Sequence, residues 1–244
     1  KREEIAFENF ETLDLGTPAT AEQSSEGNWA FHAATRTLCV GRLVQPCRRP
    51  SRSGLTIANS NNAHSGRQSL EVAEETTLPQ TALRLEEGKR YVISAWVKQP
   101  APYDDAALRI DFIRAKKSAS KYVAIGTTIY RPTGPVIDGW QRVEGEIEVP
   151  GKYSQLLLTF VRKPRNGSWP AYFVDDLRLS PEDARLETFV YDSSTLRMRA
   201  KLDENNFSSL FGYAPDGRVE SIRRETIRGV LTDSESRLHM REHP

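Results

Sequence analysis

Two adjacent carboxylates lie in the stretch "YFVDDLRLS", residues 172–180, which otherwise alternates like a β-strand. Asp175 and Asp176 could act as a catalytic acid and base, as metal ligands or as a solvated strand edge. Neighbouring side chains of a strand point to opposite faces, so the two carboxylates cannot flank one bond together. The spacing therefore disfavours a catalytic pair and leaves a metal site or a structural role.

Alternation also predicts where each carboxylate points. Asp175 falls on the face of Phe173 and Leu177, toward the interior, whereas Asp176 falls on the opposite face with Arg178. A carboxylate aimed inward is costly unless it is paired or binds a cation. Two possibilities stay open for Asp175: it binds a cation, or it accepts hydrogen bonds from backbone N–H groups or pairs with an arginine.

Other catalytic patterns are missing from the sequence. It contains no G-x-S-x-G elbow, no phosphate-binding loop and no H-E-x-x-H. His64 lies in "NAHSG", where we expect a turn residue and not a general base. The sequence therefore predicts a protein that is not an enzyme.

Composition bounds the class of protein. The 244 residues are 38% hydrophobic and 27% charged, which is typical of a globular chain. A net charge of +1 provides no strong positive potential that would attract nucleic acid, so we expect no nucleic-acid partner. No apolar run is long enough to predict membrane insertion. Cys39 and Cys47 could form a disulfide in an oxidising compartment or remain thiols in a reducing one.

Short alternating segments between turn signals predict a mostly β protein. We expect strands at residues 69–72, 90–98, 107–115, 121–130, 140–149, 155–163 and 171–180. The segments between them are rich in Pro, Gly, Asn and Asp, and we expect loops there, including residues 131–139, "RPTGPVIDG". In the strand at 140–149, we expect the glutamates to form a solvated face.

Several strands keep aromatic or charged residues on the face opposite their aliphatic side chains. This predicted groove consists of Trp96, Arg109, Asp111, Tyr122 and Tyr130. Its two tyrosines fall opposite Ile125 and Ile129 by alternation. Aromatic rings can stack on a sugar ring and charged groups can bind its hydroxyls. The alternative is that these residues pack beneath loops.

Five segments carry a family resemblance through their order and spacing: "FENFE", "HSGRQSLEV", "GKRYVISAWVK", "GWQRVEGEIEVP" and "YFVDDLRLS". Together they resemble the carbohydrate-binding jelly rolls of families 4, 9 and 22, within the galactose-binding-like fold. The resemblance spans about residues 5–180 and implies a jelly-roll β-sandwich domain at residues 1–180. It implies binding without catalysis, although such modules also occur as spacers without a ligand.

The same resemblance implies a structural calcium ion that ties the first and last strands together. Its ligands would be Asp175, Glu11, with Asn9 as a possible addition, and backbone carbonyls of the turn His64 to Gly66. These are hard oxygen ligands of the kind that Ca²⁺ prefers.

Residues 181–244 read as a second unit of short β-hairpins, with turns at "DENN" and at Asp216-Gly217. This tail resembles the tyrosine-aspartate repeats of Rhs-type proteins, with Tyr213-Ala214 where Tyr-Asp is usual. The resemblance implies that the tail continues into, or docks on, a larger assembly. Because an isolated hairpin is marginally stable, we expect the hairpins to dock on the sandwich or on another chain. The apolar side chains expected to make that contact are Phe189, Leu196, Phe207, Leu210 and Phe211.

The sequence thus predicts an all-β protein, a jelly-roll β-sandwich with a C-terminal β-hairpin extension. We expect a non-catalytic glycan-binding or adhesive module of a secreted or cell-surface bacterial protein. The alternative is an architectural spacer or subunit that binds a protein partner through its tail and a sheet edge. The glycan and the oligomeric state stay open.

Overall fold

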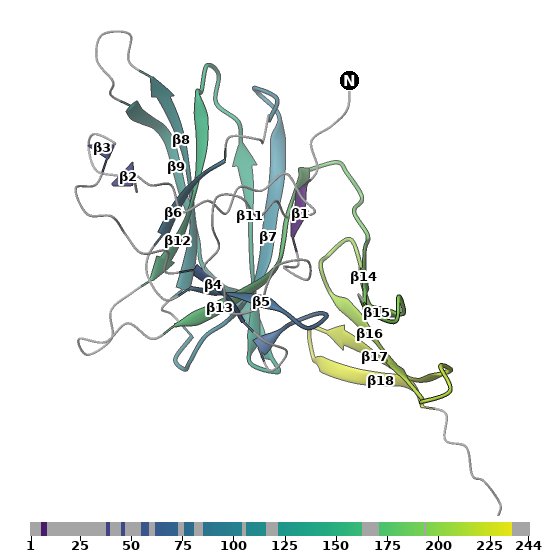
Figure 1. The fold of residues 1–244 in the computed structure, drawn as a ribbon. Coiled ribbons are helices and arrows are strands. Elements are labelled where there is room, and N and C mark those ends of the chain that lie inside the picture. The colour runs from purple at the N-terminus through teal and green to yellow at the C-terminus, as the bar shows by residue number, and fades with distance from the viewer. Residues whose placement is uncertain are drawn as a thin grey trace, which may run out of the picture.

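A computed structural model gives the fold of the chain (Figure 1). It describes residues 6–8, 38–39, 45–46, 55–58, 62–72, 76–80, 85–103, 106–115, 122–162, 171–192 and 194–235. Throughout these residues the regular structure is β-sheet, apart from isolated turns. Within this part of the chain there is no helix long and apolar enough to cross a membrane.

The first sandwich sheet has seven strands in the order β10-β11-β7-β13-β5-β4, with β1 also paired to β13. All its neighbouring strands are antiparallel. Its strands are β1 (Ala6–Glu8), β4 (Leu55–Ala58), β5 (Ser69–Val72), β7 (Arg90–Lys98), β10 (Thr133–Ile137), β11 (Trp140–Glu148) and β13 (Tyr172–Pro181).

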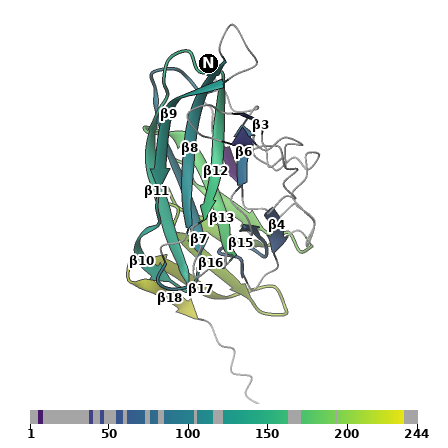
Figure 2. The same cartoon turned by 90° about the vertical axis from the view of Figure 1, so that its left-hand side faces the viewer.

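The second sandwich sheet has the order β6-β12-β8-β9 and lies in front of the first in Figure 2. Its strands are β6 (Thr76–Gln80), β8 (Ala106–Ala115), β9 (Tyr122–Tyr130) and β12 (Gln155–Arg162). The inner faces of the two sheets form one apolar core that includes Ile93, Ile110, Val143, Leu158 and Leu179. The predicted all-β jelly-roll sandwich is therefore confirmed.

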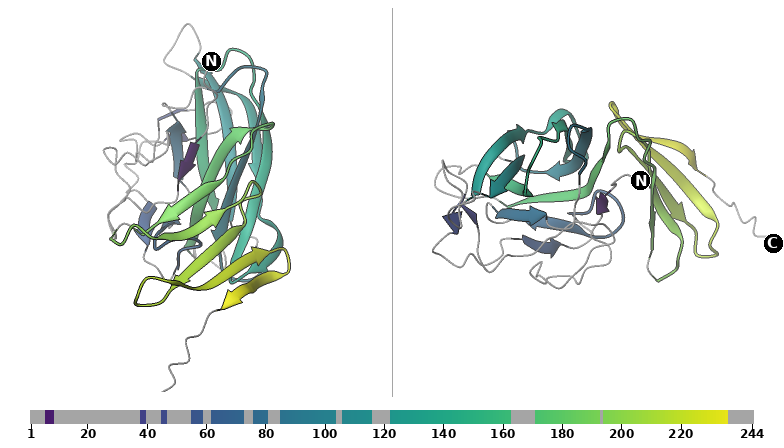
Figure 3. Two further views of the ribbon diagram at one scale, coloured as in Figure 1. Left: turned by 90° about the vertical axis from the view of Figure 1, so that its right-hand side faces the viewer. Right: turned by 90° about the horizontal axis from the view of Figure 1, so that it is seen from above.

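A third sheet follows the sandwich in the sequence and stands beside it (Figures 1 and 3). This tail sheet is a meander of β14 (Thr188–Tyr191), β15 (Met198–Leu202), β16 (Ser208–Tyr213), β17 (Val219–Thr226) and β18 (Gly229–Glu235). The predicted turns at "DENN" and Asp216-Gly217 connect β15 to β16 and β16 to β17. Separately, β2 (Leu38–Cys39) pairs with β3 (Gln45–Pro46).

The strands form where the alternation predicted them. In β11, Val143 and Ile147 are buried whereas Glu144, Glu146 and Glu148 are exposed, so the solvated glutamate face is confirmed. The segment 131–139 was wrongly predicted to be a loop throughout, because β10 pairs with β11 there despite Gly134 and Pro135. An edge strand tolerates such residues because one side of its backbone needs no sheet partner.

The predicted faces of β9 are partly wrong because the strand contains an irregularity. Its register against β8 shifts between Phe112 and Ile113, where one extra residue of β9 is accommodated. Beyond this point the alternation is reversed. Tyr130 therefore packs against the core, and Ile129 is 49% exposed.

A second irregularity, in β13, changes the position of the acidic pair. The register against β7 shifts between Asp175 and Arg178, and Asp176 has a positive φ of 48°. Asp175 is paired with Trp96, so its side chain shares the face of Trp96 and not that of Leu177. The prediction that Asp175 points into the sandwich core with Leu177 is therefore wrong.

Candidate functional site

The tail sheet covers part of the outer face of the first sandwich sheet, the face turned away from the second sheet. A second apolar cluster forms between them, with Trp96, Ile137 and Trp140 buried at its centre. Phe207 from the tail packs on Trp96 with an edge-to-face geometry and a centroid distance of 5.7 Å. This contact explains why Trp96 is only 1% exposed although it lies on the outside of the sandwich.

Polar contacts also join the tail to the sandwich. The Trp96 indole N–H donates to the carbonyl oxygen of Asn206 at 2.6 Å, and the Asn206 side-chain amide donates to the carbonyl of Asp176 at 3.1 Å. Arg178 donates to the carbonyl of Asp203 at 2.6 Å and to the hydroxyl of Thr188 at 2.9 Å. The "DENN" turn of the tail is thus held against β7 and β13.

His64 forms the centre of a buried charge cluster between the two units. Its Nδ1 lies 2.7 Å from Asp176 Oδ2 in the sandwich, and its Nε2 lies 3.0 Å from Glu225 Oε1 in the tail. Its ring stacks on Trp96 with a centroid distance of 4.3 Å and an interplanar angle of 14°. The His64 side chain is 3% exposed, and neither carboxylate side chain exceeds 3%. His64 thus lies in the predicted turn, and its side chain is buried in contacts that the sequence did not indicate.

Both carboxylates of this cluster have additional donors. Asp176 Oδ1 accepts the Ser65 hydroxyl at 2.7 Å. Glu225 Oε2 accepts the backbone N–H of Ser208 at 3.1 Å and its hydroxyl at 3.2 Å. Buried carboxylates need such partners because desolvation is otherwise uncompensated.

Two pKa values in the cluster are displaced. Burial opposes protonation of His64, but its hydrogen bonds to Asp176 and Glu225 and their charges outweigh this effect and raise the pKa to about 10. The imidazole is thus a cation that bridges two carboxylates at neutral pH. Burial, followed by the negative charge of Asp176, raises the pKa of Asp175 well above its ordinary value.

Asp175 is surrounded by backbone donors. Its Oδ2 accepts the N–H of His64 at 2.8 Å and that of Ser65 at 3.3 Å, while its Oδ1 accepts the N–H of Asp176 at 2.8 Å. This is the hydrogen-bonded arrangement that the sequence left open as an alternative to a cation. Positive φ at Gly66, 69°, lets the turn close over the carboxylate.

The predicted calcium ligands are only partly described. Asp175, His64 and Gly66 are close together, whereas Glu11 and Asn9 lie outside the described residues. No cluster of three or more acidic, histidine or cysteine side chains within the described ranges has the arrangement of a metal site. The N–H groups that point at Asp175 favour an anion there, and the calcium ion stays a prediction.

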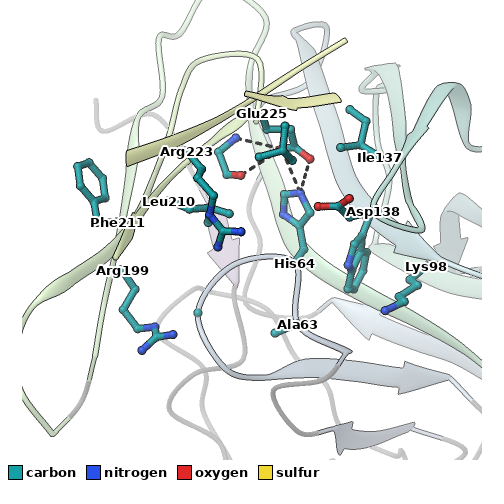
Figure 4. A pocket seen from close by; sticks show the side chains of 14 residues that line it. Ala63, His64, Lys98, Ile137, Asp138, Arg199, Leu210, Phe211, Arg223 and Glu225 are labelled. Carbon is teal, nitrogen blue, oxygen red and sulfur yellow. Dashed lines mark hydrogen bonds and ion pairs between the residues drawn. The ribbon is translucent and has the colours of Figure 1, made fainter. Parts of the chain in front are cut away.

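A cavity of about 340 Å³ opens beside His64, between the tail sheet and the end of the sandwich (Figure 4). The sandwich contributes the turn around Ala63 to Gly66 and the ends of β7, β10 and β11, and the tail contributes β15 to β18. The charged residues on its wall are His64, Lys98, Asp138, Arg199, Arg223 and Glu225. The apolar part of the wall includes Trp140, Leu210 and Phe211.

Local backbone geometry positions the sandwich side of this cavity. Asp138 and Gly139 have φ values of 48° and 85°, which suit a tight hairpin turn between β10 and β11. A side chain at Gly139 would also approach Lys98 Cε at 3.3 Å. The Lys98 ammonium lies 5.9 Å from the centroid of the Trp140 ring.

The structure does not assemble the predicted groove of Trp96, Arg109, Asp111, Tyr122 and Tyr130. Trp96 belongs to the first sandwich sheet and the other four to the second, so they cannot share one face. Arg109 donates to Asp111 at 3.0 Å, and Asp111 also accepts the Thr127 hydroxyl at 2.7 Å. Arg109 and Asp111 are thus in contact with each other, but Asp111 is 0% exposed and its carboxylate cannot contact a ligand.

Tyr130 does not offer its ring as a stacking platform, because the ring packs against the sandwich core. The hydroxyl of Tyr130 donates to the carbonyl of Glu146, and its ring lies where a side chain at Gly145 would have to be. Tyr130 thus bridges the two sandwich sheets. The side chain of Tyr122 lies outside the described residues.

Sequence reasoning missed Glu225, Arg199 and Arg223, and it assigned His64 no role in a cavity. All four line a cavity formed by segments far apart in the chain, and His64 and Glu225 are separated by 161 residues. One available signal was the alternation of β17, which places Arg223 and Glu225 on one face.

The described fold defines a jelly-roll β-sandwich with an attached hairpin sheet. Residues 47–167, just under half of the chain, match the family model described as a carbohydrate binding domain. No curated protein matches the chain.

Solved structures show weak similarity to the chain. A Clostridium thermocellum endo-1,4-β-D-xylanase 10B fragment, with its family 22 module and complexed with xylohexaose, is 15% identical at a TM-score of 0.37 over 52% of this chain and 24% of its own. A xylan-binding domain of family 22 from Paenibacillus barcinonensis is 17% identical at a TM-score of 0.38, over 59% of this chain and 93% of its own. These similarities are too low to transfer a ligand or an activity.

Proposed function

We propose that the protein is a non-catalytic glycan-binding module. The match of residues 47–167 to a carbohydrate binding domain carries this proposal. It fits a chain whose sequence contains none of the catalytic motifs sought. We further propose that the parent protein is secreted or exposed on a bacterial surface, where such modules meet polysaccharides.

The cavity beside His64 is the site that we assign to the glycan. It combines carboxylate and cationic groups, which bind hydroxyls, with the apolar surface of Leu210, which can contact a sugar ring. The predicted groove is a poorer candidate because Trp96 and Asp111 are almost fully buried. Binding would therefore involve both the sandwich and the tail.

A glycan array on the whole chain, followed by calorimetric titration of its hits, tests this proposal. Asp138→Asn should change binding about fivefold or more, and asparagine still tolerates positive φ. A neutral glycan loses a charged acceptor and binds more weakly, whereas an acidic glycan loses a repulsive carboxylate and binds more tightly. Asp216→Asn is the matched control, since Asp216 lies in an exposed turn of the tail and does not line this cavity.

Three outcomes are informative. Binding that Asp138→Asn changes and Asp216→Asn leaves unchanged supports both the function and the site. Binding that is insensitive to both changes refutes the site. A complete absence of glycan binding by the wild type refutes the function.

The alternative function is architectural, and the surface of the tail favours it. Phe189 is 46% exposed and Leu231 is 54% exposed on the side of the tail sheet away from His64, and β14 and β18 are the outermost strands of that sheet. Open sheet edges can pair with a further strand. In this alternative the tail would bind a protein partner or continue an Rhs-like array. Analytical ultracentrifugation with the parent protein would detect the resulting complex.

A further inference from the structure

The cavity beside His64 has an uneven charge distribution. Arg199 and Arg223 extend toward it from the tail sheet, and Lys98 extends toward it from the sandwich (Figure 4). The acidic residues on the same wall are Asp138 and Glu225. The sign of the field inside depends on which of these charges are already compensated.

Glu225 is compensated within the protein. Both carboxylate oxygens of Glu225 lie close to His64 Nε2, at 3.0 and 3.1 Å. Its Oε2 also accepts hydrogen bonds from the backbone N–H and the hydroxyl of Ser208. Since His64 also contacts Asp176 through its other ring nitrogen, the three side chains form a closed buried network. Asp138 is then the one carboxylate on the described wall that faces the cations.

The arginines are available to a ligand to different degrees. Arg223 is exposed and makes no ion pair with a described carboxylate. Arg199 forms an ion pair with Asp192 at 3.5 Å. Asp192 also forms an ion pair with Arg67 and accepts three hydrogen bonds from the turn that follows it. An incoming carboxylate would therefore meet one arginine without an acidic partner and one whose partner is shared.

We propose that this site recognises a saccharide that carries a carboxylate, that is, a uronic-acid unit of an acidic polysaccharide. The inference rests on the proposed glycan-binding function and specifies the ligand class for the same cavity. A guanidinium binds a carboxylate with two parallel hydrogen bonds, so Arg223 is the residue that recognises the acid and Arg199 assists it. The apolar side chain of Leu210, on the same face of the tail sheet as Arg223, then contacts the ring.

Calorimetric titration with four probes tests this inference: an oligogalacturonide, its fully methyl-esterified form, a neutral xylo-oligosaccharide and a sulfated disaccharide. The methyl ester has the same ring and linkage without the charge. We expect the free acid to bind at least tenfold more tightly than the ester, and Arg223→Gln to remove most of this preference.

Arg228→Gln is the matched control. Arg228 is an exposed arginine in the same β17–β18 hairpin that does not line the cavity, so both variants lose one positive charge. We expect Arg228→Gln to bind the acid like the wild type. Equal effects of the two variants would indicate general electrostatic attraction and would overturn the assignment to Arg223.

The remaining outcomes separate the inference from the function on which it rests. Equal affinity for acid and ester, or binding of neutral sugars alone, overturns the acidic specificity and leaves glycan binding intact. Binding of the sulfated probe without the uronate overturns the carboxylate as the recognised group. Failure of all four probes, together with an empty glycan array, overturns both.

Discussion

Replacement of His64 by alanine is the most informative test of how the tail is attached. The side chain connects Asp176 of the sandwich to Glu225 of the tail through its two ring nitrogens. Its removal leaves both carboxylates buried without the cation that lies between them. We expect a large loss of stability, because uncompensated buried charges are costly.

The size of the loss can be worked out from the contacts. Removing one partner of a buried ion pair costs roughly 3–5 kcal/mol. Loss of the His64 stack on Trp96, at 4.3 Å, adds about 0.5–1.5 kcal/mol. At about 2–4 °C of Tm per kcal/mol for a chain of this size, the ion pair alone corresponds to a decrease of roughly 6–20 °C.

Tryptophan fluorescence during thermal unfolding is a suitable assay. His64 stacks on Trp96 and lies edge-on to Trp140 at 5.5 Å, so the signal reports on the cluster itself. Lys201→Gln is the control, because its ion pair with Glu187 is exposed, with side-chain exposures of 38% and 52%. Such a surface pair is worth about 0–1 kcal/mol, so that variant should melt within a few degrees of the wild type.

A double-mutant cycle identifies the cause of the loss. His64→Gln and Glu225→Gln should show a coupling free energy of about 1 kcal/mol or more, because each change removes the same charged contact. If His64→Ala melts within a degree of the wild type, or if the two changes are simply additive, His64 does not join the tail to the sandwich and the reasoning is refuted.

Two further predictions concern pH and calcium. The folded pKa of His64, about 10, lies above the ordinary value of 6.5, so its contribution to stability is fully present below pH 6.5 and lost as the pH rises toward 10. Tm should fall over that range in the wild type, and a slope unchanged in His64→Gln would argue against this assignment. If the calcium ion predicted at Asp175, Glu11 and Asn9 is bound, EDTA should lower Tm by several degrees and added Ca²⁺ should restore it. An unchanged Tm would leave Asp175 as a hydrogen-bonded structural residue.

Much of the fold was predictable because it depends on local alternation. In β7 and β11 the spacing of aliphatic residues gave both the strand and its buried face, and Asp216-Gly217 gave the position of a hairpin. Alternation failed at the irregularities in β9 and β13, where one extra residue reverses the faces of everything beyond it. Gly126 was an available signal for the first irregularity, because an isolated glycine inside a strand often marks a bulge.

The site was far less predictable because it is formed by packing between distant segments. Burial of Trp96 depends on Phe207 and Asn206, more than a hundred residues later in the chain. From the sequence alone, Trp96 on the outer face of a sheet reads as an exposed aromatic ring. In the folded protein the tail covers Trp96, so that its ring is not available to a ligand.

Attachment of the tail and binding in the cavity should therefore be linked. His64 and Glu225 both line the cavity and both belong to the charge cluster that joins the two units. A ligand that contacts Arg223 on the tail and Lys98 on the sandwich binds only when the two are docked, so it stabilises the docked arrangement by mass action. Conversely, variants that loosen the cluster should lose affinity even though they leave the ligand-contacting arginine in place. We therefore expect the buried histidine to affect binding only through position, by holding the two halves of the cavity at a fixed separation.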